Sequence, residues 1–539
     1  MTWSSRRQSW IEPAYYLLVG GLVMGPLLRS GYILTFDMAW TQHLAAPAVG
    51  NASSTLVEWA LHALSLVVPS LLIQKLLLWG LLLLAGWGMH RLVKLRWSGP
   101  AAYLAGTFAM FNPWLYTRFM AGQYLVLAGF ALLPWLLAAV WRVLEAPARR
   151  QVLALIGWSV ALGWLSIHAI GLALLAGLVM VLLHGRVTRR AWLALGLAAG
   201  AWLVVNLFWL GPLVAGVSAQ AREIASFNLA QAEAFRTANL PGLPAPLATA
   251  LLEGFWADPV GRYVLPSSSG WLFGLAAAVW GALVITGAVV AIRRRDRLGL
   301  ALIVIGIISW WLAVGLAWGP SAGTSRWLIE HLPFYRGYRE PQKWAALLAI
   351  SYAGLAALGL DAWRRRWPWA DTQPLELGLR LVPLALVPMA LWGMGGQLRS
   401  VDYPRSWYQL NQRLLYRGPV LILPWHQYMY LDFAGRVVAN PAPNFFTTRT
   451  VTSANPEMPG VPNSAAAGSL AQRLEDDVLA YRGLTTDAGR RISRLGINYV
   501  AVLKQADWAA DAAWLSTQAG LTLVEETGGW QLWRVEAAP

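Results

Sequence analysis

The feature that most constrains the fold of this chain is a series of apolar runs, most of them about 20 residues long, separated by short clusters of basic residues. Runs of this length cross the hydrocarbon core of a bilayer as α-helices. The composition agrees, because 57% of the 539 residues are hydrophobic and only 13% are charged. Soluble domains usually have about 25% charged residues. The sequence therefore predicts a polytopic α-helical membrane protein.

The basic clusters predict how the helices are oriented. Under the positive-inside rule, short basic loops stay on the cytoplasmic side of the membrane. This distribution accounts for the net charge of +16, so nucleic acid is not expected as a partner. The clusters lie at Arg6-Arg7, 90–96, Arg149-Arg150, 186–190, 293–297 and 364–366.

Placing every basic cluster on one side requires about eleven spans. The N-terminus is then cytoplasmic, and the chain after residue 398 is extracytoplasmic. The segment 151–183 has basic clusters at both ends, so we expect it to cross twice, as a hairpin that turns near 166–168. The expected spans are 13–30, 71–89, 98–111, 123–141, the two arms of 151–183, 191–212, 271–292, 298–317, 343–361 and 378–396.

Two domains are expected from this pattern. Residues 1–397 would form the transmembrane domain, with outer loops at 31–70, 213–270 and 318–342. Residues 398–539 would form a small extracytoplasmic α/β domain, because short apolar β-rich runs alternate there with helix-like stretches.

Absent motifs exclude several kinds of chemistry. The chain has no cysteine, so it has no disulfide, no thiolate metal site and no cysteine nucleophile. It also lacks HExxH, GxSxG, Walker and Rossmann motifs. A soluble nucleotide-dependent activity is therefore not expected.

A single carboxylate, Asp37, lies among apolar residues just after the first span. A partly desolvated carboxylate has a raised proton affinity, which suits a general base. The alternative is a helix cap or a solvated aspartate at the membrane interface, and the sequence leaves both interpretations open.

Cations also gather at the predicted outer edge of the membrane, against the positive-inside trend. Arginine matches phosphate oxygens with paired hydrogen bonds, and Pro341 suits the first turn of a helix whose N-terminus attracts anions. These features predict a phosphate or pyrophosphate site. The alternative is pairing with Glu330, Glu340 and anionic lipid. The four cations of this loop are Arg326, Arg336, Arg339 and Lys343.

One further cation, Arg118, lies in the predicted outer turn 112–122, between aromatic residues. It either binds a phosphate there or extends to the lipid headgroups, and the sequence does not decide between the two.

The chain resembles the GT-C superfamily of membrane glycosyltransferases, which use polyprenyl-phosphate sugars. Two of the motifs look like the membrane part of alpha-(1->3)-arabinofuranosyltransferase-like proteins, and this likeness covers most of residues 10–365. The motifs that carry the resemblance are Thr35-Phe36-Asp37-Met38, Asn112-Pro113…Arg118…Ala121-Gly122-Gln123 and Phe334-Tyr335-Arg336-Gly337-Tyr338-Arg339-Glu340-Pro341-Gln342-Lys343.

The resemblance implies a GT-C-like fold and an inverting transfer of a sugar from polyprenyl phosphate to an envelope glycan, a lipid or a protein. In such a reaction Asp37 corresponds to the base that takes the proton of the acceptor hydroxyl. The residues around the donor phosphate would be Arg118, Arg336, Arg339 and Lys343, with Glu340, Tyr338, Arg326 and Gln123 as further candidates.

Two points stay open. Many GT-C enzymes have two adjacent acidic residues where this chain has Asp37-Met38, so participation of Mg²⁺ or Mn²⁺ is undecided.

The same basic outer edge also suits a lipid or glycolipid transporter or a non-catalytic scaffold of envelope assembly. Transporters often show duplicated halves, and no such repeat is visible in this sequence.

Overall fold

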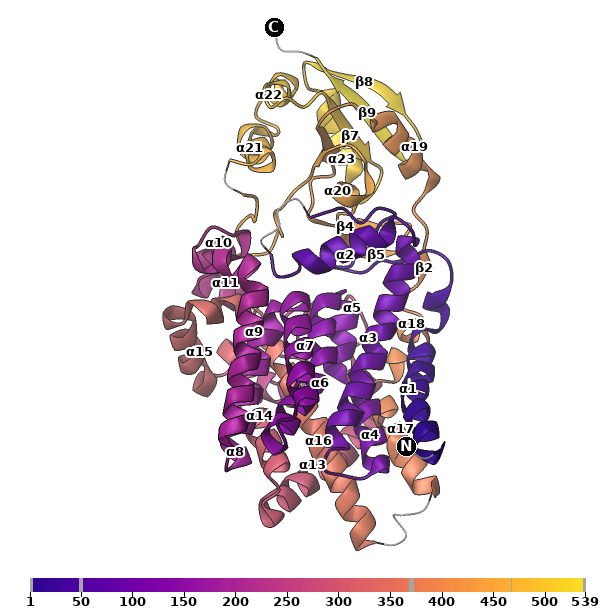
Figure 1. Ribbon diagram of the computed structural model, residues 1–539. Coiled ribbons are helices and arrows are strands. Elements are labelled where there is room, and N and C mark those ends of the chain that lie inside the picture. Colours follow the sequence, from indigo (N-terminus) through magenta and orange to yellow (C-terminus); the bar gives the residue numbers. More distant parts are fainter. Residues whose placement is uncertain (1–2, 48–51, 368–372, 467, 537–539) are drawn as a thin grey trace. The chain divides into compact units, whose positions relative to one another are not determined.

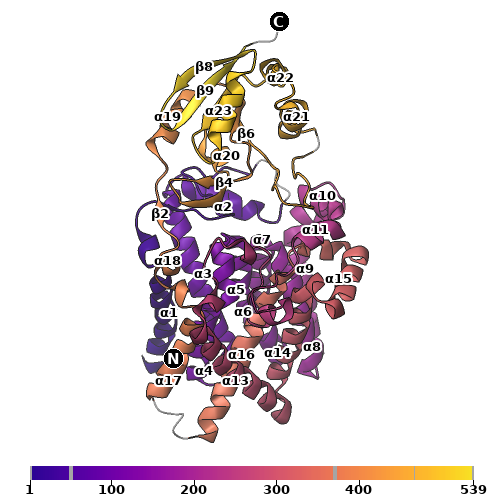
Figure 2. The ribbon, with the colours of Figure 1, turned by 180° about the vertical axis from the view of Figure 1, so that it is seen from behind.

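We describe a computed structural model of the chain over residues 3–47, 52–367, 373–466 and 468–536 (Figures 1 and 2). The chain forms two compact units. Unit 1 comprises Met1–Gly25, Ala46–Ala60 and Lys75–Gln397. Unit 2 comprises Pro26–Ala45, Leu61–Gln74 and Leu398–Pro539. Two pieces of the predicted first outer loop therefore belong to the same unit as the C-terminal segment.

Helices make up most of the chain up to Gln397, as its apolar runs predict. The longer helices are α1 (Trp3–Met24), α2 (Thr55–Ser65), α3 (Ser70–Val93), α4 (Gly99–Met110), α6 (Tyr124–Glu145), α7 (Arg149–Leu165), α8 (Ile167–His184), α9 (Arg189–Val214), α13 (Trp271–Arg294), α14 (Arg297–Val314), α15 (Gly319–His331), α16 (Ala345–Arg366) and α17 (Gln373–Leu386). The shorter ones are α5 (Pro113–Met120), α10 (Ala219–Ser226), α11 (Leu229–Ala234), α12 (Ala245–Ala250) and α18 (Leu391–Gly395).

Within the described residues, eight helices are long and apolar enough to cross a membrane, or nine if the bent pair Gly378–Leu386 and Pro388–Gly395 forms one span. The expected count of eleven is therefore not confirmed. Two of the expected spans are present as shorter helices, α4 with 12 residues and α7 with 17. The helix also breaks between α7 and α8 at Ser166, where the turn of the hairpin was expected.

Helix α16 packs closely against α13 and α14 in the core of unit 1. Small residues make this possible, because a Cβ atom at Gly287 of α13 would lie only 1.9 Å from the carbonyl oxygen of Leu355. A Cβ atom at Gly359 of α16 would likewise lie 2.0 Å from the carbonyl oxygen of Leu283. Close backbone approach through glycine is a usual way for helices to associate in a membrane.

Unit 2 contains a five-stranded mixed sheet with strand order β6-β3-β7-β9-β8. One of its central strands, β3, is apolar throughout and fully buried, as expected for a strand covered on both faces. β3 pairs in parallel with β6 and β7, and β9 pairs antiparallel with β7 and β8. The strands are β3 (Val420–Leu423), β6 (Thr450–Val451), β7 (Tyr499–Leu503), β8 (Leu521–Glu526) and β9 (Trp530–Val535).

Five helices of unit 2 accompany this sheet, and side chains from α21, α22 and α23 join its hydrophobic core. They are α19 (Arg405–Leu414), α20 (Ala442–Phe445), α21 (Leu470–Asp477), α22 (Ala488–Arg494) and α23 (Trp508–Ser516).

Two smaller strand pairs complete unit 2. β1 (Tyr32–Ile33) pairs antiparallel with β2 (Ser400–Val401), and β4 (Tyr428–Leu431) forms a hairpin with β5 (Arg436–Ala439). The β1–β2 pair joins the predicted first outer loop to the beginning of the C-terminal segment. The residues that follow β1 along the chain include Asp37.

Candidate functional site

Asp37 lies on a tight turn of unit 2 rather than at the end of a helix. The backbone N–H of Thr35 donates to the carbonyl of Met38 at 3.1 Å, and the N–H of Met38 donates back at 2.7 Å. Phe36 has a left-handed φ of 41°, which closes the turn. The side chain of Asp37 is exposed and accepts a hydrogen bond of 2.7 Å from the Tyr428 hydroxyl at Oδ1.

A second group of predicted residues forms a buried cluster in unit 1. The fully buried Arg118 donates from Nη1 to Glu340 Oε2 and to Gln123 Oε1, both at 2.8 Å. Lys343 Nζ lies 3.9 Å from Glu340 Oε1 and 3.1 Å from His168 Nε2. Two motifs that are more than 200 residues apart in the sequence therefore meet around one carboxylate.

The Asn-Pro motif positions Arg118. The Asn112 side chain accepts the N–H of Leu115 at 2.9 Å and donates to the carbonyl of Phe108 at 3.0 Å, which separates α4 from α5. Pro113 suits the first position of α5 because it has no backbone N–H, and an N–H at that position would have no partner within the helix. Trp114 then donates from Nε1 to the carbonyl of Gln342 at 2.8 Å. This bond links the turn directly to the loop that carries Glu340.

The electrostatics of the cluster keep Glu340 charged. Burial alone would raise the pKa of Glu340, but Lys343 and Arg118 hold it well below its usual range. Nε and Nη2 of Arg118 are buried and have no hydrogen-bond partner among the described residues. The Phe255 ring centroid lies 4.1 Å from Arg118 Cζ and covers the guanidinium. Unused donors on a buried cation are costly, so they favour an additional anionic ligand.

The other predicted cations have different surroundings. Arg336 donates from Nε to the carbonyl of Ile329 at 2.8 Å, near the end of α15. Arg339 is half exposed and lies 2.5 Å from Glu223. Arg326 is exposed on α15. These three arginines therefore do not join Arg118 and Lys343 in their hydrogen bonds and ion pairs with Glu340.

Tyr338 lies between the buried cluster and the aromatic core of the loop. Its hydroxyl donates to the carbonyl of His168 at 2.5 Å, and its ring stacks on Trp344 at 4.7 Å between centroids. The contact of His168 with Lys343 has no local signal in the sequence, because the two residues are 175 positions apart.

Two buried carboxyl groups in the loop 213–270 were not assigned a role from the sequence. Asp258 accepts the N–H groups of Gly254 and Phe255 at 2.9 and 2.8 Å and the Tyr263 hydroxyl at 2.6 Å. These bonds hold the turn that places Phe255 over Arg118. Burial raises the pKa of Asp258 to about 6 and that of Glu253 to about 7.

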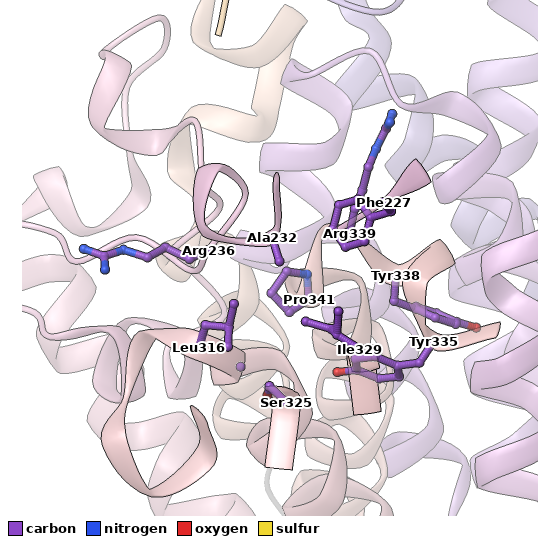
Figure 3. A pocket seen from close by; sticks show the side chains of 11 residues that line it. Phe227, Ala232, Arg236, Leu316, Ser325, Ile329, Tyr335, Tyr338, Arg339 and Pro341 are labelled. Carbon is purple, nitrogen blue, oxygen red and sulfur yellow. The ribbon is translucent and has the colours of Figure 1, made fainter. Parts of the chain in front are cut away.

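A pocket lies beside the arginine-rich loop (Figure 3). Its empty volume is about 290 Å³, including the part open to solvent. Leu316, Ile329 and Pro341 line it, while the guanidinium groups of Arg236 and Arg339 extend away from its centre. The lining is therefore mainly apolar and suits a hydrocarbon group better than a phosphate.

The side chains near Asp37 bear on whether Mg²⁺ or Mn²⁺ could bind there. Within the described ranges, no group of three or more His, Asp or Glu side chains could hold a metal ion. The residue after Asp37 is Met38, whose thioether is a poor ligand for Mg²⁺ or Mn²⁺. The described side chains at Asp37 therefore do not fit a resident Mg²⁺ or Mn²⁺ ion.

No protein-family model matches the chain, and no curated protein matches it in sequence. Solved structures do match its fold. The structure of arabinofuranosyltransferase AftD from Mycobacteria has a TM-score of 0.67 and 16% identity, over 99% of this chain and 40% of that one. A mutant structure of the same enzyme has a TM-score of 0.62 and 15% identity, over 99% and 42%. ArnT from Cupriavidus metallidurans, with a TM-score of 0.38 and 14% identity over 99% and 100%, is too distant for comparison.

These likenesses show that the chain has the fold of this arabinofuranosyltransferase, as the resemblance of its motifs predicts. The chain spans about two fifths of the length of AftD.

Proposed function

We propose that the chain is a membrane glycosyltransferase. It would move a sugar from a polyprenyl-phosphate donor to a glycan, lipid or protein acceptor on the outer face of the plasma membrane. The observation that carries this proposal is the likeness of 99% of the chain to the fold of an arabinofuranosyltransferase. The N-terminus would be cytoplasmic and the C-terminal domain extracytoplasmic, as the basic loops predict.

Asp37 is the proposed general base. The acceptor hydroxyl oxygen forms a bond to the anomeric carbon while its proton passes to the Asp37 carboxylate. The bond between the anomeric carbon and the phosphate oxygen breaks, and polyprenyl phosphate leaves with the electron pair. Attack from the opposite side inverts the configuration. An exposed carboxylate on a hydrogen-bonded turn is accessible to such an acceptor.

Arg118 and Lys343 are the proposed stabilisers of the leaving phosphate. Both are buried, where a cation acts more strongly on developing negative charge than it does in water. The two N–H groups of Arg118 that lack a hydrogen-bond partner favour this role. The Phe255 ring, which covers the guanidinium, would move aside when the polyprenyl-phosphate sugar enters. Arg339 is a second candidate because it is partly exposed, whereas Arg336 is already engaged by backbone carbonyls.

The full chain in lipid nanodiscs, incubated with a panel of labelled polyprenyl-phosphate pentoses and hexoses, tests this proposal. We expect labelled product and release of polyprenyl phosphate. Asp37→Asn should reduce the rate by about 100-fold or more, because general bases usually contribute that much. Asp476→Asn, which changes another exposed aspartate of unit 2, is the matched control.

Other outcomes favour the alternatives. Movement of an intact glycolipid across proteoliposomes without bond cleavage would indicate a transporter. If neither bond cleavage nor glycolipid movement is detected, the scaffold interpretation is favoured. Full transfer by Asp37→Asn would exclude Asp37 as the base.

A further inference from the structure

We propose that unit 2 is part of the catalytic apparatus, with Tyr428 as the positioning residue for Asp37 and the β4–β5 hairpin as the platform on which the Asp37 turn is held. This inference rests on the proposed function, because it takes Asp37 as the base. It gives the C-terminal segment a defined task in the reaction.

The backbone of the turn is hydrogen-bonded to the hairpin. The N–H of Phe36 donates to the carbonyl of Val437 at 3.2 Å, and the N–H of Ala439 donates to the carbonyl of Phe36 at 2.7 Å. Phe36 thereby adds to the edge of β5 like a residue of a further strand. Both backbone polar groups of Phe36, the residue that precedes Asp37, are therefore hydrogen-bonded to the hairpin.

Side chains of the hairpin hold the turn as well. Arg436 donates from Nη1 to Thr35 Oγ1 at 3.2 Å. The Phe36 ring packs against the Tyr428 ring, with 5.1 Å between the centroids. Tyr428 is 391 residues from Asp37 in sequence, and its hydroxyl lies 2.7 Å from Asp37 Oδ1. Residues before, at and after Phe36 are thus all in contact with β4 or β5.

A tyrosine is a suitable partner for a general base. A neutral hydroxyl fixes the orientation of a carboxylate and leaves its charge in place, whereas an arginine would neutralise that charge. The carboxylate keeps further lone pairs with which to accept a proton. The ring of Tyr428 has few rotatable bonds and packs on Phe36, so its hydroxyl is held in place at low entropic cost.

The alternative is that the β4–β5 hairpin stabilises the Asp37 turn without any effect on the reaction. A double-mutant cycle separates the two, because groups that act through one another are not additive. Tyr428→Phe removes the hydroxyl and keeps the ring that packs on Phe36. Tyr430→Phe makes the same change two residues further along β4, where the side chain is 47% exposed, and serves as the matched control.

We expect Tyr428→Phe to lower kcat by roughly 2- to 12-fold, the equivalent of one hydrogen bond, with donor KM and melting temperature unchanged. Tyr430→Phe should match the wild type. In the Asp37→Asn background, Tyr428→Phe should cause no further loss. If residual turnover of Asp37→Asn is too slow to measure, the cycle is run with Asp37→Glu, in which the longer side chain already displaces the carboxylate from Tyr428.

Two results would overturn the inference: a wild-type kcat for Tyr428→Phe, or a loss that adds in full to that of the Asp37 variant. Its failure differs from failure of the proposed function. If Asp37→Asn is inactive while Tyr428→Phe is normal, only the positioning role is wrong. If Asp37→Asn is fully active, the base assignment falls and the positioning role falls with it.

Discussion

At the scale of single residues, the environment of each charge matters more than its identity. Arg118 and Arg339 both form an ion pair with a glutamate, but Arg118 is fully buried and the side chain of Arg339 is 43% exposed. Removing one partner of a buried pair leaves an uncompensated charge, whereas an exposed pair exchanges its partner for water.

Arg118→Gln should therefore destabilise the protein by about 3–5 kcal/mol, whereas Arg339→Gln should cost about 0–1 kcal/mol. Thermal and denaturant unfolding in detergent measures both. Adding Glu340→Gln to Arg118→Gln should restore part of the loss, because it removes the stranded carboxylate. Equal effects of the two arginine variants would contradict the burial argument.

His426 of unit 2 lies between two carboxylates. Its Nδ1 is 2.7 Å from Glu457 Oε1, and its Nε2 is 3.0 Å from Asp507 Oδ1. Partial burial alone would lower the pKa of His426, but the hydrogen bonds to Glu457 and Asp507 raise it above its usual value. A raised pKa in the folded state means that the charged ring stabilises the fold below the unfolded pKa of about 6.5. This stabilisation is lost as the pH rises through the folded-state pKa.

We therefore expect the difference in melting temperature between the wild type and His426→Gln to be largest below about pH 6.5 and to shrink as the pH rises further. Scanning fluorimetry of the full chain over that range provides the measurement. His331→Gln, at an exposed histidine, is the control. A difference that grows with pH would show that the ion pairs do not stabilise the fold.

At the scale of elements, the tight packing of α13 and α16 depends on glycine. Neither helix shows this in its hydrophobic pattern, since both are apolar around most of their circumference. The requirement arises because the backbone of each helix approaches the other at Gly287 and Gly359. By contrast, a Cβ atom added at Gly281 of α13 would lie within 4 Å of no atom outside the neighbouring backbone of its own helix.

Gly359→Ala should destabilise the protein by about 1–3 kcal/mol, because the added methyl forces the helices apart. Gly281→Ala should be neutral or stabilising by up to about 1 kcal/mol, since alanine favours the helix. Unfolding in detergent compares the two variants. An equal loss at both positions would mean that helix propensity, rather than packing, decides the effect.

At the scale of the whole molecule, the proposed topology follows from charge alone. The chain contains no cysteine, so a single introduced cysteine can be labelled without background. Ser516 on α23 and Arg294 at the end of α13 are both exposed positions. They are predicted to lie on opposite sides of the membrane.

Ser516→Cys should react with a membrane-impermeant maleimide in intact spheroplasts, whereas Arg294→Cys should react only after permeabilisation. Mass shift or fluorescence of the labelled chain gives the result. Comparable expression of both variants is the necessary control. The reverse labelling pattern would invert the topology and place Asp37 on the cytoplasmic side.

The sequence by itself determined the helical membrane architecture, because burial of about 20 apolar residues in lipid is decided locally. The predicted segments 271–292 and 298–317 correspond closely to α13 (Trp271–Arg294) and α14 (Arg297–Val314). The motif around Asn112 and the loop ending at Lys343 were also recognisable as unusual. The count of spans was less secure, since short helices such as α4 gain their burial from neighbouring helices rather than from their own length.

Only the tertiary structure decided which polar groups meet. The pairing of Arg118 with Glu340 and of Tyr428 with Asp37 joins residues 222 and 391 positions apart. No local pattern encodes such contacts, because a hydrogen bond depends on atoms within about 3 Å and the fold alone brings them together. For the same reason the sequence grouped Arg336 and Arg339 with Arg118, whereas the structure gives each of them its own partner.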